Sequence, residues 1–248
     1  MLKKFVKFIC VVLCIAMLLP FTAVAEGNIQ GRYPWVQEPT HHTDITEGSW
    51  YANNCRFVYH YGYMTGTSDT EFSPHKIVTR EMAVFIIENM VYGNSIERPE
   101  RTCSGNYFKD IEPDQYYSNS IQWAYEKGIT AGIGDGYFGI GQPITRQDFL
   151  VMLYHTINKY YYQYIWDEIK PYDGDDVSDY AREAAGFFIS GYEWRESTGE
   201  GVELPPSVIF APPGESYRLK DYLTRAEAAT MIAIYTCGHN YKIIGWSY

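Results

Sequence analysis

The stretch Leu223-Thr224-Arg225-Ala226-Glu227 decides the fold, because its Thr-Arg core recurs at Thr79-Arg80 and at Thr145-Arg146. Each occurrence opens the same helical pattern. The first two copies align without a gap, 145 − 79 = 66 residues apart. The other aligned pairs are Asp44 with Asp110, Gly62 with Gly128, Gly66 with Gly132, and Phe72 with Phe138. Repetition at a fixed offset indicates units that bury their apolar faces against one another, so we expect the copies to form one body.

A third copy follows with longer loops. It keeps the 18-residue step from aspartate to glycine, since 191 − 173 and 128 − 110 both equal 18. We therefore align Asp173 with Asp110 and Gly191 with Gly128. The chain then lengthens before Phe210-Ala211-Pro212 and again before the third Thr-Arg pair.

Each copy has the pattern of a helix, a glycine turn, a short extended segment and a second helix. Apolar residues spaced by three and four predict one buried face on the first helix. These residues are Cys55, Val58 and Tyr59 in copy one, Ile121, Ala124 and Tyr125 in copy two, and Ala184, Phe187 and Phe188 in copy three. Gly62, Gly128 and Gly191 follow where a left-handed residue would end the helix.

The second helix begins at the threonine of each pair. Thr145 with Asp148 and Thr224 with Glu227 suit a capping box, in which hydroxyl and acid bond reciprocally to backbone amides. Copy one has Met82 at the third helical position, so it should lack this arrangement.

An apolar face repeats in register along the three second helices. It consists of Ala83, Ile86, Ile87 and Met90, then Phe149, Met152, Leu153 and Thr156, then Ala228, Met231, Ile232 and Tyr235. Three such faces can pack into a central three-helix bundle. The predicted fold class is all-α, with three helix-loop-helix repeats.

The arginine of each pair lies in the first helical turn, where free amides and the helix dipole favour an anion. A guanidinium beside those amides suits a carboxylate ligand. The structural alternative is a salt bridge within each copy, to the repeated aspartate. Both roles could hold together, with the aspartate orienting the arginine.

The order of features in each copy is an early aspartate, an aromatic residue, a helix ending in glycine, a turn, and the Thr-Arg pair. The aromatic residues are Trp50-Tyr51, Tyr116-Tyr117 and Tyr180, and the turns include Phe72-Ser73-Pro74 and Phe210-Ala211-Pro212. This order resembles the S-layer homology family over residues 43–237, and residues 223–227 are closest to its Thr-Arg-Ala-Glu motif. The departures are Glu81-Met82, Gln147-Asp148, and Gly139-Ile140 in place of the turn proline. They predict three unequal sites.

The resemblance implies a pseudo-threefold, three-pronged module that anchors proteins noncovalently to the secondary polysaccharide of a bacterial cell wall, commonly through pyruvylated amino sugars. The arginine would contact the acidic sugar, and aromatic rings would stack on sugar faces in grooves between copies. The carbohydrate-binding residues that we expect are Arg80, Arg146, Arg225, Thr79, Thr145, Thr224, Asp44, Asp110, Asp173, Trp50, Tyr116, Tyr117 and Tyr180. Arg146 and Arg225 should matter more than Arg80, because copy one lacks the capping acid.

Residues 1–25 have the pattern of a secretory signal, with a basic start, a short apolar run and the small-residue site Ala23-Val24-Ala25. The expected segments after it are a lead (26–42), copy one (43–92), a linker (93–106), copy two (107–159), an aromatic linker (160–170), copy three with insertions (171–237) and a tail (238–248). The apolar run is too short to span a bilayer, and we expect no membrane span after signal removal.

The charge of the chain limits its partners. Removing residues 1–25 takes away three lysines and no acids, which leaves 17 Lys and Arg against 30 Asp and Glu, or 17 − 30 = −13. Such a charge argues against nucleic acid as a partner and against nonspecific adhesion to an anionic surface. Attachment to a wall therefore needs local, specific sites.

We expect no cofactor, no metal site and no catalytic site. The aspartates between residues 173 and 179 do not fit the spacing of a calcium loop, and no nucleophile elbow or catalytic carboxylate pair stands out. Cys55 lies on an apolar helix face, which predicts a buried thiol, whereas a disulfide between Cys103 and Cys237 stays open.

The predicted function is therefore noncatalytic binding of wall polysaccharide by a secreted protein of the cell wall, cell surface or S-layer. The alternative is an interaction protein with decayed sugar sites. It would recruit another surface protein through the enlarged third copy, at about residues 195–209 and 213–222.

Overall fold

The computed structural model describes residues 41–93, 98, 107–160, 172–189, 193–195, 201–203 and 216–239. Every described residue lies in one unit of the chain, Pro39–Tyr248. The predicted signal, Gly191, the Phe210-Ala211-Pro212 turn and the aromatic run after residue 160 lie outside the described residues.

The described part of the chain is built from α-helices. They are α3 (Ala52–His60), α4 (Arg80–Tyr92), α5 (Ser118–Glu126), α6 (Arg146–Tyr160), α7 (Arg182–Ile189) and α8 (Arg225–His239). A turn of 3-10 helix, η3 (Asp179–Ala181), leads into α7. The strands β1 (Glu193–Arg195) and β2 (Gly201–Glu203) form a short antiparallel hairpin. The all-α fold class is confirmed, and the hairpin near the predicted insertion of copy three is an addition that the sequence did not indicate.

The first two copies end their first helices as predicted. Gly62 follows α3 with φ 69°, and Gly128 follows α5 with φ 70°. The next residue after each glycine donates its N–H to the carbonyl oxygen five residues back, at 2.8 Å in both copies. This bond caps a free helix carbonyl, so the helix stops where glycine permits the left-handed turn.

The predicted faces of the second helices form the core. All twelve residues of these faces are at most 4% exposed. Fully burying one large aliphatic side chain contributes about 1.5–3 kcal/mol, so the faces are a main source of stability. On the first helices, the prediction is wrong for Tyr125, which is 43% exposed because its ring packs at the edge of the core on Tyr107 and Phe108.

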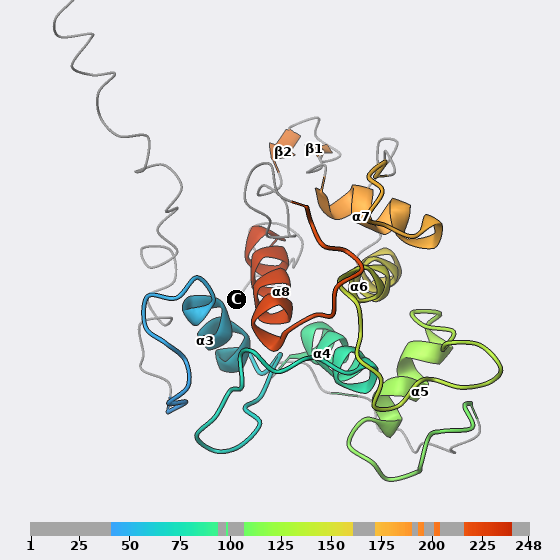
Figure 1. Cartoon of the computed structure of the whole chain (residues 1–248), viewed down its shortest axis with the longest axis horizontal. Coiled ribbons are helices and arrows are strands. Elements are labelled where there is room, and N and C mark those ends of the chain that lie inside the picture. Colours follow the sequence, from blue (N-terminus) through green and yellow to red (C-terminus); the bar gives the residue numbers. More distant parts are fainter. Residues whose placement is uncertain are drawn as a thin grey trace, which may run out of the picture. The chain divides into compact units, whose positions relative to one another are not determined.

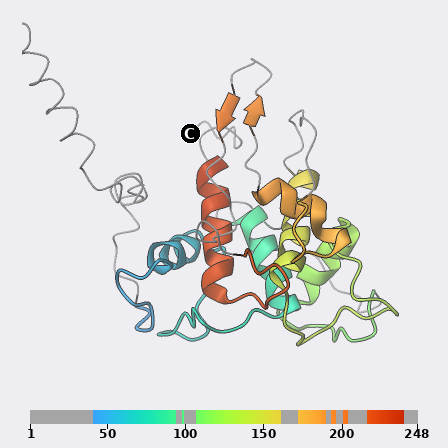
Figure 2. The same cartoon turned by 45° about the horizontal axis from the view of Figure 1, so that its top comes forward.

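The helices pair between copies rather than within them. α3 of copy one packs on α8 of copy three, α5 of copy two on α4 of copy one, and α7 of copy three on α6 of copy two. Figures 1 and 2 show α4, α6 and α8 grouped centrally, with α3, α5 and α7 outside them. Each first helix therefore completes the core of the preceding copy.

A closed ring of backbone hydrogen bonds joins the segments that lead into α4, α6 and α8. Val78 donates to Leu223 at 2.8 Å, Leu223 donates to Ile144 at 3.0 Å, and Ile144 donates to Val78 at 3.0 Å. All three residues are fully buried. The ring brings the starts of the three second helices, and with them the three Thr-Arg pairs, to one place.

Candidate functional site

Each motif arginine reaches out of its own copy. Its Nε–H donates to a backbone carbonyl oxygen in the turn of the next copy. The pairs are Arg80 with Phe138 at 3.0 Å, Arg146 with Tyr217 at 3.0 Å, and Arg225 with Phe72 at 2.8 Å. We name the three places the Arg80, Arg146 and Arg225 sites. Because the arginine of copy three binds the turn of copy one, the three contacts link the copies in a closed cyclic order.

The turn of copy three lies at Tyr217. Tyr217 stands 224 − 217 = 7 residues before its threonine, as do Phe72 (79 − 72) and Phe138 (145 − 138). The alignment of Phe210-Ala211-Pro212 with these turns is therefore wrong. Phe210 and Pro212 resemble Phe72 and Pro74 of copy one, and the alignment followed this resemblance. It should have followed the constant distance of seven residues between the turn and the threonine.

The residue after each turn carbonyl has a left-handed backbone. The φ angles are 56° at Ser73, 91° at Gly139 and 50° at Arg218. Only glycine adopts this region without strain, so Ser73 and Arg218 need support from their surroundings. In copy one Asp44 gives it, because its carboxylate accepts the N–H groups of Phe72 at 2.8 Å and Ser73 at 2.6 Å.

Copy two uses its aspartate in the same way. The Asp110 carboxylate accepts N–H groups from Phe138 at 2.8 Å, Gly139 at 2.8 Å and Ile140 at 3.0 Å. Burial alone would raise the pKa of Asp110, but these bonds together hold it below its usual value. The predicted aspartates thus shape the turns.

In copy three this role belongs to Asp176, not to Asp173. Asp176 accepts the backbone N–H of Leu219 and the hydroxyl of Ser216, the latter at 2.8 Å. Burial alone would raise the pKa of Asp176, and these bonds with one from Tyr172 hold it below its usual value. Aligning Asp173 with the other aspartates is therefore wrong by three residues.

A signal for the correct register was present in the sequence. The pairs Asp44-Ile45, Asp110-Ile111 and Asp176-Val177 follow one another at steps of 66 residues (110 − 44 and 176 − 110). The β-branched residue of each pair is buried. The glycine spacing to Gly191 hid this constant step.

The structural alternative of a salt bridge within each copy is wrong for the described residues. The carboxylates of Asp44 and Asp110 bind turn amides, and each turn offers its carbonyl oxygen to the arginine of the preceding copy. Aspartate and arginine therefore act on one turn from two copies. The aspartate orients the turn rather than the arginine side chain.

The three guanidiniums are largely buried. The exposed fraction is 7% for Arg80, 1% for Arg146 and 6% for Arg225. Arg80 lies 5.4 Å from the centroid of the Phe138 ring, and Arg225 lies 4.8 Å from that of Phe72. Burial is the largest cause that lowers the pKa of each arginine, yet an arginine starts so far above neutrality that all three stay charged.

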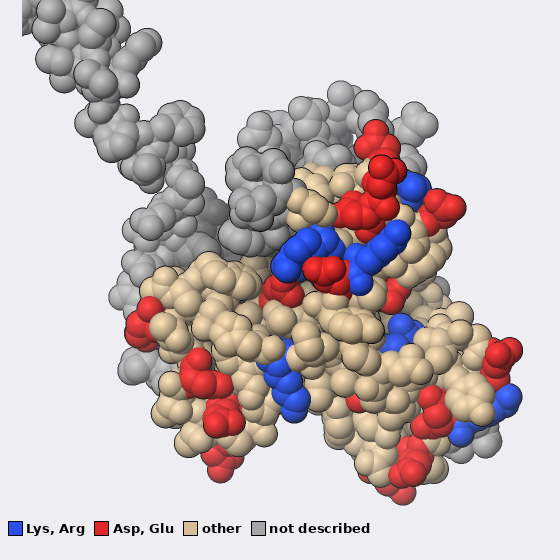
Figure 3. All heavy atoms as spheres, viewed as in Figure 1, with Lys and Arg blue, Asp and Glu red and all other residues tan. Residues whose placement is uncertain are grey.

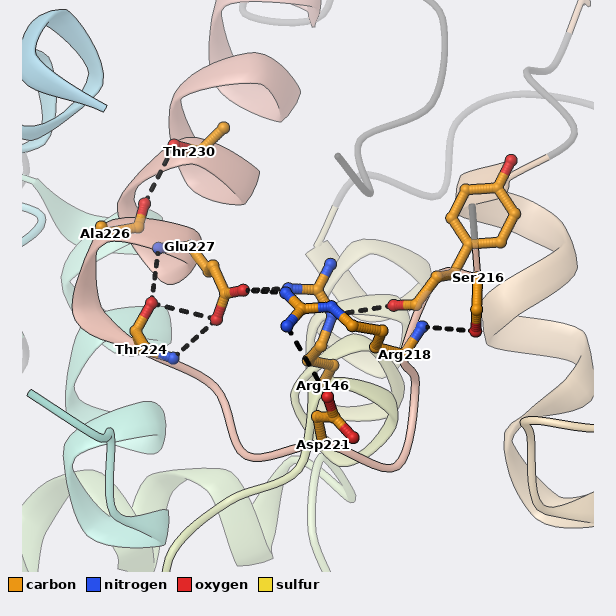
Figure 4. A network of polar contacts seen from close by, with 9 residues as sticks. Arg146, Ser216, Arg218, Asp221, Thr224, Ala226, Glu227 and Thr230 are labelled. Carbon is orange, nitrogen blue, oxygen red and sulfur yellow. Dashed lines mark hydrogen bonds and ion pairs between the residues drawn. The ribbon is translucent and has the colours of Figure 1, made fainter. Parts of the chain in front are cut away.

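An internal carboxylate already fills the Arg146 site. Nη1 of Arg146 lies 2.8 Å from Oε1 of Glu227, and Nη2 of Arg218 lies 2.8 Å from the same oxygen. Figure 4 shows both guanidiniums on one side of the Glu227 carboxylate and Thr224 on its other side. The charge of Arg146 is thus neutralised within the protein.

The Arg80 site is less completely filled. The charge of Asp148 acts on Arg80, but its Oδ1 accepts the hydroxyl of Tyr180 at 2.5 Å. No carboxylate of the described residues lies within ion-pair distance of Arg80. Glu81 beside it accepts the N–H of Gly141 at 3.0 Å.

The Arg225 site has the fewest acids around it. Nη2 of Arg225 donates to the carbonyl oxygen of Thr65 at 2.5 Å, in addition to the bond from Nε. After burial, the groups that act on the pKa of Arg225 are the Cys55 thiol, Asp44 and Tyr116. Asp44 is engaged by the turn, and within the described ranges Arg225 forms no ion pair.

The threonines cap their helices unequally, as predicted. In copy three, Glu227 Oε2 accepts the N–H of Thr224 at 2.9 Å, and the N–H of Glu227 donates back to the threonine hydroxyl at 3.3 Å. Thr145 accepts the N–H of Asp148 at 3.2 Å. Thr79 has no side-chain cap bond, and its hydroxyl is buried without a hydrogen-bond partner.

The expected aromatic residues are mostly exposed. The exposed fraction is 48% for Trp50, 56% for Tyr116 and 61% for Tyr180, whereas Tyr117 is partly buried. Tyr116 belongs to the surroundings of Arg225, and Tyr180 to those of Arg80. Burial and the bond to Asp148 raise the pKa of Tyr180 to about 12. Two of the arginine sites thus have an exposed tyrosine close by.

The remaining sequence predictions concern metals, thiols and membranes. In the described part of the chain, no three His, Cys, Asp or Glu residues come together to hold a metal. Cys55 is a buried free thiol, and burial raises its pKa to about 12. Cys103 and the side chain of Cys237 lie outside the described residues. None of the described helices combines the length and apolarity that a bilayer crossing requires.

The two regions with this geometry match a known family. Residues 43–83 and 107–150 match the S-layer homology domain. These two regions of the chain are S-layer homology domains. Copy three lies outside these two matches, although it contributes the same kind of turn and arginine. Anchoring to the cell wall is the general function of these domains, and the matched family model is that of a binding domain.

Relatives of the chain include surface proteins. It is 28% identical over 170 residues to an amylopullulanase of Thermoanaerobacterium thermosulfurigenes, covering 67% of this chain and 8% of the relative. It is 23% identical over 184 residues to cell surface glycoprotein 1 of Acetivibrio thermocellus, covering 70% and 7%. It is 28% identical over 138 residues to a cell surface protein of Thermoanaerobacter kivui, covering 55% and 16%. The chain thus spans a small part of each relative, and the matches place it at the cell surface.

Proposed function

We propose that this chain anchors noncovalently to a bacterial cell wall by binding the secondary wall polysaccharide, through an acidic, pyruvylated amino sugar. The observation that carries the proposal is the Arg225 site. Its guanidinium is held by two backbone carbonyl oxygens, from Phe72 and Thr65, and lacks a carboxylate among the described residues. The carboxylate of a pyruvate ketal would complete it.

We extend the proposal to copy three as a third repeat of the same kind. Its arginine clasps the turn of copy one, and its own turn at Tyr217 is clasped by Arg146. Its aspartate supports that turn as the others do. These contacts support the equivalence of the copies, although their loops differ in length.

Exposed aromatic rings would supply the second half of a sugar site. Tyr116 is 56% exposed, and its ring packs edge-to-face on Phe85 at 5.5 Å, which fixes it beside the Arg225 site. A sugar ring stacked on Tyr116 could present its carboxylate to the guanidinium. The hydroxyl of Thr224 is held by Glu227, so we assign Thr224 to the helix cap rather than to the ligand.

Local recognition agrees with the charge of the protein. The formal charge of the whole sequence is −10, which opposes general attraction to an anionic wall. Figure 3 shows some basic side chains near the middle of the face viewed, while acidic side chains lie at its margins and beside the basic ones. Binding should therefore depend on particular arginines rather than on a basic surface.

Cosedimentation with purified walls tests the proposal. The protein should pellet with intact walls and stay in solution after the secondary polysaccharide has been removed chemically. A free pyruvylated amino sugar should compete. Retention on stripped peptidoglycan would overturn the proposal and favour the alternative, in which the enlarged copy three recruits another surface protein.

A further inference from the structure

The third helical position differs among the three copies. It holds Met82 in copy one, Asp148 in copy two and Glu227 in copy three. In each case the second helix that carries it belongs to the copy whose turn is clasped by the preceding arginine. Glu227 therefore corresponds to the Arg146 site, Asp148 to the Arg80 site and Met82 to the Arg225 site.

We infer that this residue selects which site accepts an acidic sugar: Glu227 closes the Arg146 site, Asp148 half-closes the Arg80 site, and Met82 leaves the Arg225 site open. The inference rests on the proposed function and names the specificity-determining residues of the same sites.

Glu227 shows how closure works. One of its oxygens lies 2.8 Å from Nη1 of Arg146, and the other accepts the N–H of Thr224 at 2.9 Å. Arg146 is 1% exposed, against 6% for Arg225. A carboxylate from outside would have to displace this internal one, which Arg218 also holds, with its Nη2 2.8 Å from the same oxygen.

Asp148 is shorter by one methylene and takes a different partner. Its Oδ1 accepts the Tyr180 hydroxyl, and its remaining influence on Arg80 is through charge alone. Gln147 also donates to the Tyr180 hydroxyl at 3.0 Å, which keeps the tyrosine in place. The Arg80 site therefore keeps an acid nearby that repels a ligand carboxylate without occupying the guanidinium.

Met82 has no charge to offer. The groups that act on Arg225 include no residue at the third helical position, unlike those that act on Arg80 and Arg146. The same methionine leaves the Thr79 hydroxyl buried without a partner. One substitution at this position should thus change both the helix cap and the site.

The test compares Met82→Glu with Met82→Gln. Both variants lose the same methionine packing, and both side chains can form the capping box with Thr79. Only glutamate brings a carboxylate to Arg225. We expect Met82→Glu to lower the affinity for intact walls about tenfold relative to Met82→Gln, while the thermal melts of the two variants stay alike.

A double variant tests the reverse change. Glu227→Gln in the Met82→Glu background should restore part of the lost wall binding, because it frees Arg146. Equal wall affinity of Met82→Glu and Met82→Gln, with both folded, would overturn the inference. If the unmodified protein bound stripped and intact walls alike, the proposed function itself would fail, so the two failures are distinguishable.

Discussion

A guanidinium presents five N–H donors in a fixed plane, so one arginine can serve two partners at once. Nε of each motif arginine holds the turn of the next copy. The terminal nitrogens differ, because Nη1 of Arg146 pairs with the Glu227 carboxylate, whereas Nη2 of Arg225 donates to the backbone carbonyl oxygen of Thr65 and pairs with no carboxylate of the described residues. The motif arginines therefore have the same structural role, but they differ in whether their terminal nitrogens are available to a ligand carboxylate.

This difference predicts unequal binding. Arg225→Ala should weaken wall binding about tenfold or more, because a charged hydrogen bond is worth about 1.5–3 kcal/mol. Arg146→Ala should instead lower the free energy of unfolding by about 1.5–3 kcal/mol and leave the affinity of the folded protein for walls unchanged. Cosedimentation and urea unfolding measure the two effects. Equal loss of affinity in both variants would contradict this ranking, which separates two arginines that the sequence had placed together.

A second prediction at this scale concerns His42. Its ring is 5% exposed, its Nδ1 is buried without a hydrogen-bond partner, and it packs edge-to-face on Tyr59 and Phe72. Burial is the largest cause that lowers its pKa, helped by His41 and Arg225 and opposed by Asp44. The unfolded chain therefore takes up the proton first as the pH falls below about 6.5, and stability is lost there.

His42→Phe should remove that part of the acid sensitivity. Copy two carries Phe108 at the equivalent position (108 − 42 = 66), 5% exposed, so the ring fits this environment. Melting temperatures at pH 7.5 and 5.5 check the prediction. The drop on acidification should be smaller in the variant than in the parent, and an unchanged drop would show that other groups cause it.

At the scale of the element, the helix caps give a matched pair of variants. Thr224→Ala removes a reciprocal capping box and should cost about 1 kcal/mol. Thr79→Ala removes a hydroxyl that is buried without a partner, so it should cost little or stabilise. Urea unfolding compares them. A larger loss from Thr79→Ala than from Thr224→Ala would show that the caps do not decide the stability of these helix starts.

The sequence predicted the elements where the signal was local. Periodicity identified the buried faces of the second helices, and the acid at the third position identified the capped starts of α6 and α8. The sequence alignment placed the aspartate of copy three at Asp173, three residues too early. Because the loops of this copy are longer, the alignment depended on one spacing alone, the 18 residues from Asp173 to Gly191. It also missed Glu227 as the partner of Arg146, since that contact joins two copies.

At the scale of the whole molecule, pairing between copies makes the stability collective. α6 packs against α4 of copy one and against α7 of copy three. Unfolding of α6 should therefore destabilise both of these helices. Leu153 on α6 is fully buried, and Leu153→Asp places an uncompensated charge in the core. We expect all three copies to lose their structure together. Amide hydrogen exchange measures this loss.

Ile133→Asp serves as the control for this prediction, because Ile133 is 47% exposed and its replacement leaves the core intact. In the Ile133→Asp variant the backbone amides of all three copies should stay protected from hydrogen exchange. If the amides of α3 and α8 stayed protected in Leu153→Asp, the copies would be independent units. Periodicity could not have predicted this coupling, because it shows which face is buried and not which copy covers it.

The hydrogen bond between Arg225 and Phe72 joins residues that are 153 positions apart, so the two parts of the Arg225 site are synthesised at different times. A chain grows from its N-terminus at about 5–20 residues per second, so α8 arrives roughly 8–30 s after the turn that it must hold. Until then α3 has no helix to pack on, and the Arg225 site does not exist. The site that we propose as open therefore cannot form, and cannot bind a wall, before α8 has been made.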